Sequence, residues 1–335
     1  MSVTVTINDR RLLALPEGVP LLSALNANHV FLPSACGGRG ACGLCRVTVH
    51  GGAALPFSPA ELKKLSAAER QHGVHLACQL EVRDGLQIWI PDELLRVSLF
   101  EVEVAALRDL THDIKEVTLQ LLTPPSIDFK AGQYVQLRAP EGPRRKRNVW
   151  RAYSIASPPS QKTRIQLQVR LVPNGLVSVF VHQELRTGDR LQITGPWGEF
   201  YLRENASELL LVAGGVGMAP IRAMLLDLLE KKSTRSIRYF FGAVSAADLF
   251  LMDEMRALER ELPHFQFVPA LSAPRPEDAW TGERGLITEV LERRLETDSQ
   301  AEAYLCGSPA MIEACVAVLL RKGIPDSRIF YDKFA

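Results

Sequence analysis

The chain has 335 residues, 47% of them apolar and 23% charged, with a formal net charge of +1. This length exceeds one ordinary core, so we expect two or three domains, and the balanced charge speaks against a nucleic-acid partner. The most apolar stretch, residues 209–229, is interrupted by glycines, Pro220, Arg222 and Asp227, which argues against a membrane span. The strand-like start lacks the layout of a signal peptide. We expect a cytoplasmic protein, with peripheral membrane association left open.

Three blocks of different pattern follow one another along the chain. Residues 1–96 combine alternating strand patterns, a short helical pattern and four of the six cysteines. Residues 97–205 are a succession of short strand patterns separated by Gly and Pro turns, which predicts a small antiparallel barrel. Residues 206–335 alternate apolar strands with helical stretches, a pattern typical of a doubly wound parallel α/β sheet. We therefore predict a three-domain protein with these boundaries.

The first block carries a loop rich in cysteine and glycine. Cys36, Cys42 and Cys45 lie within ten residues, and Cys78 follows after 32 intervening residues. Structural zinc sites usually offer two separated cysteine pairs, whereas three cysteines in one loop and a distant fourth are typical of [2Fe–2S] ferredoxins. Glycine lets backbone N–H groups turn toward a negatively charged cluster. The glycines of the loop are Gly37, Gly38, Gly40 and Gly43. A zinc site and ordinary buried thiols are the alternatives at this point.

The block resembles a plant-type ferredoxin domain, which implies a β-grasp fold. It departs from the usual pattern because five residues, rather than four, separate Cys36 from Cys42. The form C-G-G-x-G-x-C-G-x-C is similar to the ferredoxin domain of the F subunit of sodium-pumping NADH:quinone reductases. This resemblance implies that the four cysteines are the ligands of a [2Fe–2S] cluster.

The second block contains the stretch WRAYSIAS, Trp150–Ser157. A cluster accepts one electron at a time, so a hydride donor needs an intermediary such as flavin, which accepts two electrons and releases them singly. On a strand, Arg151 and Tyr153 point to one face and Ser154 to the other. Arginine suits a flavin phosphate, tyrosine can stack on the isoalloxazine ring, and the serine hydroxyl can reach flavin N5. Taken alone, the tetrapeptide, with Ala152 at its second position, also fits an ordinary barrel strand.

A second flavin signal follows in the same block. Gly175, Val177 and Ser178 open a helical pattern whose first N–H groups suit a pyrophosphate. The segment GPWGEFYL then closes the predicted barrel. Together with RAYS, these stretches resemble the FAD domain of the ferredoxin–NADP reductase superfamily, which implies FAD as cofactor.

The third block opens with the strand LLLVA, the turn GGVGMAP and a helix. We expect Pro220 at the first position of that helix. The turn does not match the G-x-G-x-x-G dinucleotide fingerprint. Its glycines nevertheless let a cofactor pyrophosphate approach the backbone closely; they are Gly214, Gly215 and Gly217. The motif G-M-A-P, which begins with Gly217 and Met218, resembles the NAD(P) loop of the same superfamily.

Two features near the C-terminal end extend this resemblance. The stretch CGSPAM resembles the superfamily motif C-G-x-x-x-M, which implies that Cys306 and Gly307 lie beside the nicotinamide; a buried strand-end thiol is the alternative. The chain ends FYDKFA, and in this superfamily a C-terminal aromatic covers the flavin face on which nicotinamide stacks. Phe334 is the first candidate and Tyr331 the second, the alternative being a terminal strand that only packs. Cys315 lies among apolar helix neighbours, and we expect it in the core.

The choice of nicotinamide cofactor can be argued from charge. The NADP 2′-phosphate needs a cation near the end of the third strand of the α/β block. That strand ends in Ser272, Ala273 and Pro274, and the earlier loop GAVSAADLF has no cation. The loop carries Asp248, which suits ribose hydroxyls and repels phosphate. We therefore expect NADH, with NADPH kept open by Arg275.

Two sets of polar residues have no clear place in this scheme. Residues 144–147 form a basic run before the flavin motif, and such runs are usually solvated; FAD phosphate and an acidic partner are the alternatives. The run is Arg144, Arg145, Lys146 and Arg147. His29, His75 and His112 have no metal-like spacing with the cysteines, and we expect them at the surface or as capping residues.

The resemblance covers the whole chain and matches two groups. One is the reductase components of multicomponent oxygenases, such as phenol hydroxylase and benzoate dioxygenase; the other is the sodium-pump F subunit, although the absent N-terminal helix argues against membership of that membrane complex. We predict an NADH-dependent electron-transfer flavoprotein in which Ser154 bonds flavin N5, Cys306 lines the pocket and Phe334 covers the ring. Electrons leave through the cluster to a protein acceptor: an oxygenase, a corrinoid protein or another redox protein. The alternatives are a diaphorase or quinone reductase without a dedicated partner, and a non-catalytic sensor or zinc-stapled module.

Overall fold

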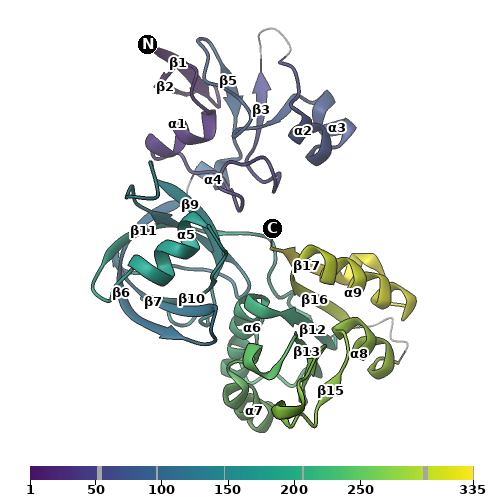
Figure 1. Ribbon diagram of the computed structural model, residues 1–335. Helices are drawn as coiled ribbons and strands as arrows, with labels where there is room; N and C mark the ends of the chain where they lie inside the picture. Colours follow the sequence, from purple (N-terminus) through teal and green to yellow (C-terminus); the bar gives the residue numbers. More distant parts are fainter. Residues whose placement is uncertain (51–54, 96, 147, 206, 297–300, 335) are drawn as a thin grey trace.

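The computed structural model describes residues 1–335 except 51–54, 96, 147, 206, 297–300 and 335. Figure 1 shows a small N-terminal domain, a barrel below it and an α/β domain beside the barrel. Each has its own buried apolar core. The predicted three-domain architecture is confirmed. The boundaries that we placed after residues 96 and 205 stay predictions.

The N-terminal domain is a mixed sheet with strand order β2-β1-β5-β3-β4. Strands β1 and β5 run parallel, and the other neighbours are antiparallel. Alternation along β1 buries Val5 and Ile7 and leaves Thr4 exposed. Ser58 and Ser66 each begin a short helix with a reciprocal capping box. The elements are β1 (Ser2–Ile7), β2 (Arg11–Pro16), α1 (Leu21–Ala27), β3 (Arg46–His50), α2 (Pro59–Lys64), α3 (Ala67–Gln71), β4 (Val74–Leu76), β5 (Gln87–Trp89) and the connecting α4 (Asp92–Leu95).

The middle domain is an antiparallel sheet with strand order β10-β7-β6-β11-β8-β9. A bridge between Ile155 and Leu167 joins the two edges of the sheet and rolls it into a barrel. Ile165, Leu167 and Val169 fill the interior, while the residues between them point outward. The elements are β6 (Ser98–Asp109), β7 (Ile114–Thr123), β8 (Tyr134–Ala139), β9 (Val149–Ser154), β10 (Arg164–Arg170), α5 (Leu176–Val179) with a π-helical turn (Phe180–Glu184), and β11 (Arg190–Trp197).

The C-terminal domain is a parallel sheet with strand order β15-β14-β13-β12-β16-β17. One apolar core lies under α6 and α7 and a second under α8 and α9, so helices cover both faces. The order reverses between β12 and β16, and the carboxyl ends of these two strands form the crevice in which such sheets bind ligands. The elements are β12 (Leu209–Gly214), α6 (Met218–Glu230), β13 (Ile237–Ala243), α7 (Met252–Glu261), β14 (Phe265–Leu271), β15 (Glu283–Arg284), α8 (Ile287–Arg294), β16 (Glu302–Gly307), α9 (Pro309–Arg321) and β17 (Ile329–Lys333).

Helix α6 begins two residues earlier than we predicted. Its first residue is Met218, so Pro220 is the third residue of the helix rather than the first. A 3₁₀ turn, Gly215–Gly217, leads directly into the helix and starts the helical geometry before the proline. Proline is tolerated at this position because the N–H groups of the first helical turn have no partner within the helix.

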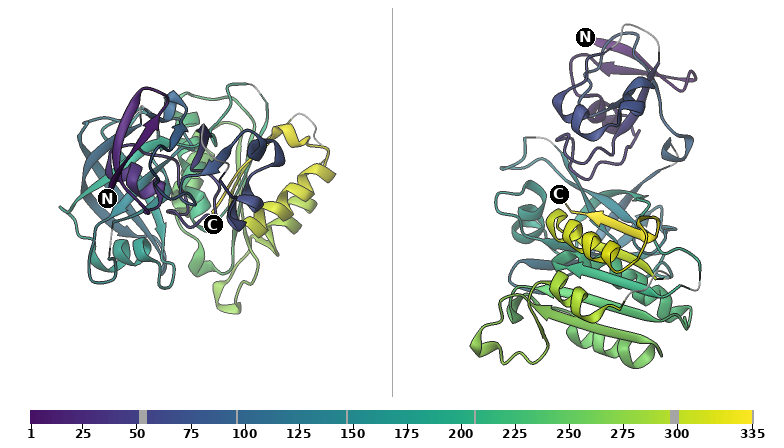
Figure 2. Two further views of the ribbon diagram at one scale, coloured as in Figure 1. Left: turned by 90° about the horizontal axis from the view of Figure 1, so that it is seen from above. Right: turned by 90° about the vertical axis from the view of Figure 1, so that its right-hand side faces the viewer.

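The N-terminal domain packs on strands β8 and β9 of the barrel. The rings of Phe31 and Trp150 meet edge to face with centroids 5.9 Å apart. The Gln136 side chain, on β8, donates a hydrogen bond to the Leu32 carbonyl over 3.0 Å in a buried setting. Figures 1 and 2 show that the C-terminal end of β17 reaches the same junction. The segment leading into the cysteine loop is therefore anchored beside the RAYS strand.

Helix α6 joins the C-terminal domain to the barrel. Its Arg222 is buried and donates from Nη1 to the Ala156 carbonyl over 2.9 Å and to Gln166 Oε1 over 2.8 Å. The same guanidinium forms an ion pair with Glu254 on α7. A buried arginine with three partners fixes the C-terminal domain against strand β10 of the barrel.

Candidate active site

The four predicted cluster ligands meet as two pairs. Cys42 Sγ lies 3.4 Å from Cys36 Sγ and donates to it, and the Cys45 thiol hydrogen-bonds Cys78. Cys36, Cys45 and Cys78 are buried, and Cys42 is half-buried. Among the described residues, no three histidine, cysteine or carboxylate side chains are arranged around one metal ion. Paired thiols match a cluster with two iron atoms better than a single ion.

Backbone N–H groups of the loop point at these sulfurs. The hydrogen bond from the Cys42 thiol, together with the N–H groups of Cys42, Ala41 and Arg39, lowers the pKa of Cys36 to about 4. The bond with Cys45, assisted by the Gln79 side chain and the N–H of Gly40, lowers the pKa of Cys78 to about 7. The same two thiol–thiol bonds raise the pKa of Cys42 and of Cys45, so these two thiols keep the proton of each pair. In each pair the loop thus stabilises one thiolate despite its burial, and thiolates are the ligands of a [2Fe–2S] cluster.

The cysteine loop contacts strand β9, which carries the RAYS residues, directly. Gly37 has φ +63°, and a Cβ at this position would come within 1.7 Å of Arg151 Nη1 and 2.6 Å of the Trp150 carbonyl oxygen. Arg151 Nη1 in turn donates to that carbonyl over 2.8 Å. A residue with a side chain could not occupy this position without moving the loop away from the barrel.

A cavity of about 290 Å³ opens where the three domains meet. Its walls include every residue that we predicted on the flavin strand and its helix, together with the predicted C-terminal aromatic. These are Arg151, Ala152, Tyr153, Ser154, Gly175, Val177, Ser178 and Phe334. The cluster loop contributes Ala35, Arg39 and Leu44, and the turn and first helical residues after β12 contribute Val216 and Ala219. Residues that are far apart in the sequence thus converge on one volume.

The polar groups of this cavity differ in their burial. Ser154 is 5% exposed, and burial raises the pKa of the Tyr153 hydroxyl. Asp332, two residues before Phe334, also lines the cavity, and burial raises the pKa of its carboxyl to about 6. The Phe334 backbone N–H donates to the Gly307 carbonyl over 2.9 Å. Tyr331, the second aromatic candidate, is 46% exposed and is not among the cavity residues.

A larger cavity of about 940 Å³ separates the N-terminal domain from the barrel. It shares Arg39, Arg151 and Leu176 with the smaller cavity, so the two are continuous along one wall. Arg144 and Lys146 of the basic run are exposed and line it. The cations along these walls suit the phosphates of a dinucleotide such as FAD.

The other residues of the basic run have a different setting. Arg145 is 3% exposed, forms a bidentate ion pair with Glu184 at 2.9 and 2.8 Å, and lies over the Phe180 ring. It therefore holds the loop onto the π-helical turn, contrary to the solvated setting expected for the run. Arg147 lies outside the described residues.

The nicotinamide-type turn packs tightly on strand β16. A Cβ at Gly217 would lie 2.1 Å from the Cys306 carbonyl oxygen. Cys306 is fully buried beneath this turn, and burial followed by the charge of Asp332 raises the pKa of its thiol. Gly214 and Gly307 face each other at the carboxyl ends of β12 and β16, where the Met311 side chain covers both. Of the predicted residues of this group, five lie at or directly after the carboxyl ends of β12 and β16: Gly214, Gly215, Gly217, Cys306 and Gly307. Met218 and Pro220 are buried in the first turn of α6, and none of the seven lines the 290 Å³ cavity.

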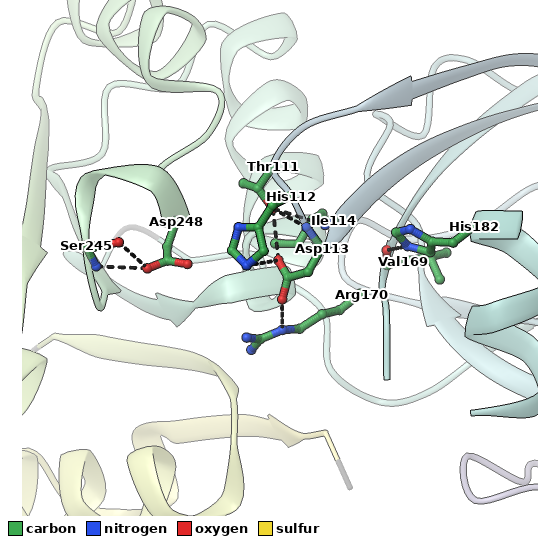
Figure 3. Close-up of polar contacts among 9 residues, drawn as sticks. All are labelled: Thr111, His112, Asp113, Ile114, Val169, Arg170, His182, Ser245 and Asp248. Carbon is green, nitrogen blue, oxygen red and sulfur yellow. Dashed lines mark hydrogen bonds and ion pairs between the residues drawn. The ribbon is translucent and has the colours of Figure 1, made fainter. Parts of the chain in front are cut away.

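Figure 3 shows polar contacts of strand β10, of the loop before β7 and of the loop after β13. Arg170, at the end of β10, donates to Asp113 over 2.7 Å, and its guanidinium lies next to Gly215. Asp248 accepts from the Ser245 N–H and hydroxyl through Oδ2. Cys315 is buried in the second core of the domain, as we predicted.

One of the three histidines that we predicted at the surface or as capping residues is buried. His29 and His112 are exposed, as expected. His75 is 3% exposed, lies 3.1 Å from Glu61 and stacks on the Phe57 ring, so the surface assignment was wrong for this residue. His75 and the adjacent Leu76 of β4 are both buried, and the buried Glu61 carboxylate supplies the partner that a buried imidazole needs.

Sequence reasoning missed several cavity residues. Gln168 and Asp332 each belong to a strand whose pattern only indicates packing, and Tyr134 begins a barrel strand. Asp332 lay within the FYDKFA stretch that drew attention to Phe334, so its carboxylate two residues earlier was an available signal. Gln168 alternates with the apolar residues of β10 as an outward-facing side chain would, so its burial had no signal in the sequence.

The fold and the site define a class of protein: an oxidoreductase that joins a [2Fe–2S] ferredoxin domain, a flavin domain and a nicotinamide-nucleotide domain in one chain. Family models match in the same order. They are a 2Fe-2S iron-sulfur cluster binding domain over residues 5–83, an oxidoreductase FAD-binding domain over 101–201 and an oxidoreductase NAD-binding domain over 211–317.

Comparison with known proteins narrows the class. The F subunit of the Na⁺-translocating NADH-quinone reductase of Neisseria gonorrhoeae is 35% identical, over 99% of this chain and 91% of its own length. Its counterpart from Pseudomonas aeruginosa is 36% identical over the same shares. The chain belongs to the family of three-domain iron–sulfur flavoprotein reductases that includes these proteins. This membership decides between the cluster and the zinc alternative in favour of the cluster.

Solved structures extend the likeness over the whole chain. A cytochrome P450 reductase from Amycolatopsis superposes with a TM-score of 0.77 at 29% identity, covering 99% of this chain and 98% of its own. The ferredoxin reductase in carbazole 1,9a-dioxygenase gives 0.75 at 27% identity, covering 100% and 99%. The protein is an NAD(P)H-dependent reductase of ferredoxin-reductase type, in which electrons pass from NAD(P)H to FAD and then to the [2Fe–2S] cluster. Among its described helices, none is long and apolar enough to cross a membrane.

Proposed function

We propose that this chain oxidises NADH and delivers the electrons singly, through its cluster, to a separate redox protein. One observation carries the proposal: the cavity of about 290 Å³ is lined jointly by the flavin strand, the nicotinamide-type turn and the cluster loop. When bound, FAD supplies the conversion between two-electron and one-electron transfer. Because they share one cavity, the turn that would face the electron donor and the loop that would hold the electron acceptor both lie next to the flavin site.

The chain's own residues have distinct tasks in this scheme. Ser154 presents a buried hydroxyl to the reacting edge of the flavin ring, and Phe334 covers the face on which nicotinamide stacks. Arg151 lies between the cavity and Gly37, where its guanidinium would hold the flavin phosphates beside the cluster loop. Cys306 lies beneath the Gly217 turn, so we assign it to the wall of the nicotinamide pocket and not to the reaction itself. The cluster ligands are the four paired cysteines.

The preference for NADH rests on the loops after β13 and β14. Asp278 Oδ2 accepts from the N–H groups of Ala246 and Arg275 and ties the two loops together. Asp248 lies in the first of these loops, so two carboxylates border the position of the adenosine ribose. They favour ribose hydroxyls over a 2′-phosphate. Arg275 is exposed, with Glu277 3.9 Å away, which weakens it as a phosphate ligand.

The proposed acceptor is a protein of the oxygenase type. The two solved structures reported above are named as a cytochrome P450 reductase and as the reductase in a carbazole dioxygenase. A corrinoid protein or another one-electron carrier would accept electrons by the same route. The relatives of known sequence are named as subunits of an NADH-quinone reductase, so a quinone is the second candidate acceptor.

Anaerobic titration with NADH and with NADPH tests the proposal. We expect NADH to bleach the flavin absorbance and to produce the axial EPR signal of a reduced [2Fe–2S] cluster, and NADPH to do so at much higher concentration. Absence of the EPR signal after complete flavin reduction would refute the order of transfer.

Substitution of one cluster ligand separates the two halves of the route. Cys78→Ser is expected to abolish reduction of a protein acceptor while leaving flavin reduction by NADH intact, because the ligand is remote from the nicotinamide crevice. Cys315→Ser changes a thiol of the α/β core and serves as the control that keeps the EPR signal. Equal loss of flavin reduction and electron output in Cys78→Ser would contradict the scheme. Quinone reduction that survives in this variant would identify a direct route from the flavin.

A further inference from the structure

Strand β10 presents a row of polar side chains on its outer face. Gln166, Gln168 and Arg170 alternate with interior residues and therefore share one face of the strand. Gln166 accepts from Arg222, and Arg170 is paired with Asp113. Gln168, between them, is 3% exposed, and neither its Nε2 nor its Oε1 has a hydrogen-bond partner among the described residues.

An amide in this state needs an explanation. Nearly all buried polar side-chain atoms in native proteins are hydrogen-bonded, and leaving both ends of a carboxamide unpaired destabilises the fold. An apolar side chain of the same length would pack at this position without that penalty. The glutamine is therefore expected to have a partner outside the polypeptide.

The nearest candidate within the protein does not account for it. Glu116 lies directly opposite Gln168 in the antiparallel register of β7 and β10. Its Oε2 has no hydrogen-bond partner among the described residues, although Arg222 Nη1 lies 4.0 Å away. A carboxylate only accepts hydrogen bonds, so Glu116 could satisfy Gln168 Nε2 but never Oε1. The other carboxylate oxygen of Glu116 is already paired with Arg108 at 2.9 Å. A donor for Gln168 Oε1 must come from elsewhere.

Gln168 lines the same cavity as Ser154 and Phe334. Ser178, a neighbour on that wall, has its hydroxyl engaged with the Val172 backbone and offers Gln168 no free partner. The group expected in the cavity is the flavin ring, whose pyrimidine edge carries an N–H donor flanked by carbonyl acceptors. A carboxamide presents one donor and one acceptor side by side and is complementary to such an edge.

We propose that Gln168 is a flavin-binding residue, whose side-chain amide pairs with the donor and acceptor groups of the isoalloxazine ring. The inference rests on the proposed function, because it takes the cavity as the flavin site. It adds a side-chain contact that the RAYS motif and the helix after Gly175 do not provide. It also explains why the strand keeps a buried amide between Leu167 and Val169.

The test uses Gln168→Met in the full-length chain with its cluster assembled. Methionine keeps the length of the side chain and removes both polar ends. If the amide serves the flavin, the deflavinated variant is more thermostable than the deflavinated wild type, while its dissociation constant for FAD, from fluorescence titration, rises about tenfold. These two effects have opposite signs, whereas loss of a structural hydrogen bond would weaken both properties.

Two matched variants control for the neighbours. Gln166→Met removes the same side chain from the same face of β10, loses the bond from Arg222 and is expected to lower thermostability without changing FAD affinity. Glu116→Gln tests the cross-strand alternative. If Glu116→Gln reproduces the changes of Gln168→Met, or if Gln168→Met binds FAD with wild-type affinity, the proposal is overturned.

A charged variant provides a second readout. Gln168→Glu places a carboxylate at the ring edge, and we expect the flavin midpoint potential to fall because negative charge disfavours the reduced, electron-rich ring. An unchanged potential would overturn the proposal even if Gln168→Met fails to fold. Failure of the proposed function would be distinguishable, since the wild type itself would then give no cluster EPR signal with NADH, whatever the affinity of the Gln168 variants for FAD.

Discussion

The contact between the cluster loop and the barrel makes a strong prediction for Gly37→Ala. The new Cβ would fall 1.7 Å from Arg151 Nη1 and 2.6 Å from the Trp150 carbonyl oxygen, far inside van der Waals contact. Overpacking at a closed interface costs about 1–3 kcal/mol, and the left-handed φ of +63° adds about 1 kcal/mol for a residue with a Cβ. The overlap can be relieved only by moving the loop away from strand β9. A penalty of about 3 kcal/mol lowers the equilibrium constant for docking of the loop about 100-fold.

Rapid mixing of the anaerobic enzyme with NADH measures the consequence. We expect flavin reduction at the wild-type rate, because the nicotinamide crevice is untouched, and slower appearance of the reduced-cluster EPR signal. Gly38→Ala is the matched control. It introduces the same methyl group in the same loop at φ +90°, with its nearest neighbours at an ordinary 3.8 Å and on the cluster side. Wild-type cluster reduction in Gly37→Ala, or an equal defect in Gly38→Ala, would refute the assigned role of the interdomain contact.

Two further predictions concern stability. Burial raises the pKa of Asp332 from 3.8 to about 6, so the folded state keeps this proton to a higher pH than the unfolded state does. The free energy of unfolding therefore falls by about 3 kcal/mol as pH rises from about 4 to about 6, and it stays at the lower value above that pH. Asp332→Asn removes this pH dependence, so the melting temperature of the variant should rise increasingly above that of the wild type between about pH 4 and pH 6 and then keep a constant difference. A difference that shrinks with rising pH would contradict the burial of the carboxyl. Arg145→Met should destabilise the barrel by about 2 kcal/mol, because it removes a charge-assisted bidentate pair to Glu184, whereas Arg144→Met should change the melting temperature very little. Equal melting temperatures for these two variants would show that the basic run acts as a uniform solvated patch.

The parts of the site that follow from local chemistry could be predicted from the sequence. The spacing of the four cysteines favours a [2Fe–2S] cluster over zinc, and the resemblance to ferredoxins implies that they are its ligands. The RAYS strand and the helix after Gly175 carry their predicted phosphate-binding groups within a few consecutive residues. The alternation of strands and helices after residue 206 is equally local, and it predicts a doubly wound sheet before any packing is known.

The parts that depend on packing between domains could not be predicted. Gln168 and Asp332 acquire meaning only because three domains enclose one cavity, and no spacing in the sequence records that enclosure. His75 was misassigned because its partner Glu61 lies in a different element, on helix α2, and the pairing needs the folded sheet. Pro220 was misplaced by two residues because a 3₁₀ turn of glycines begins the helix early.

The five-residue gap between Cys36 and Cys42 shows how one loop serves two neighbours. Ala41, with Cys42 itself, directs N–H groups at Cys36, which is the task of the loop toward the cluster. Gly37 meets Arg151 on the barrel, and the Arg39 side chain lines both interdomain cavities while its Nε donates to the Cys36 carbonyl over 3.1 Å. These contacts point in different directions, and a loop that must reach the sulfurs and the flavin strand at once needs enough backbone to turn between them. The segment between Cys36 and Cys42 therefore contacts the Cys36 sulfur and the barrel together.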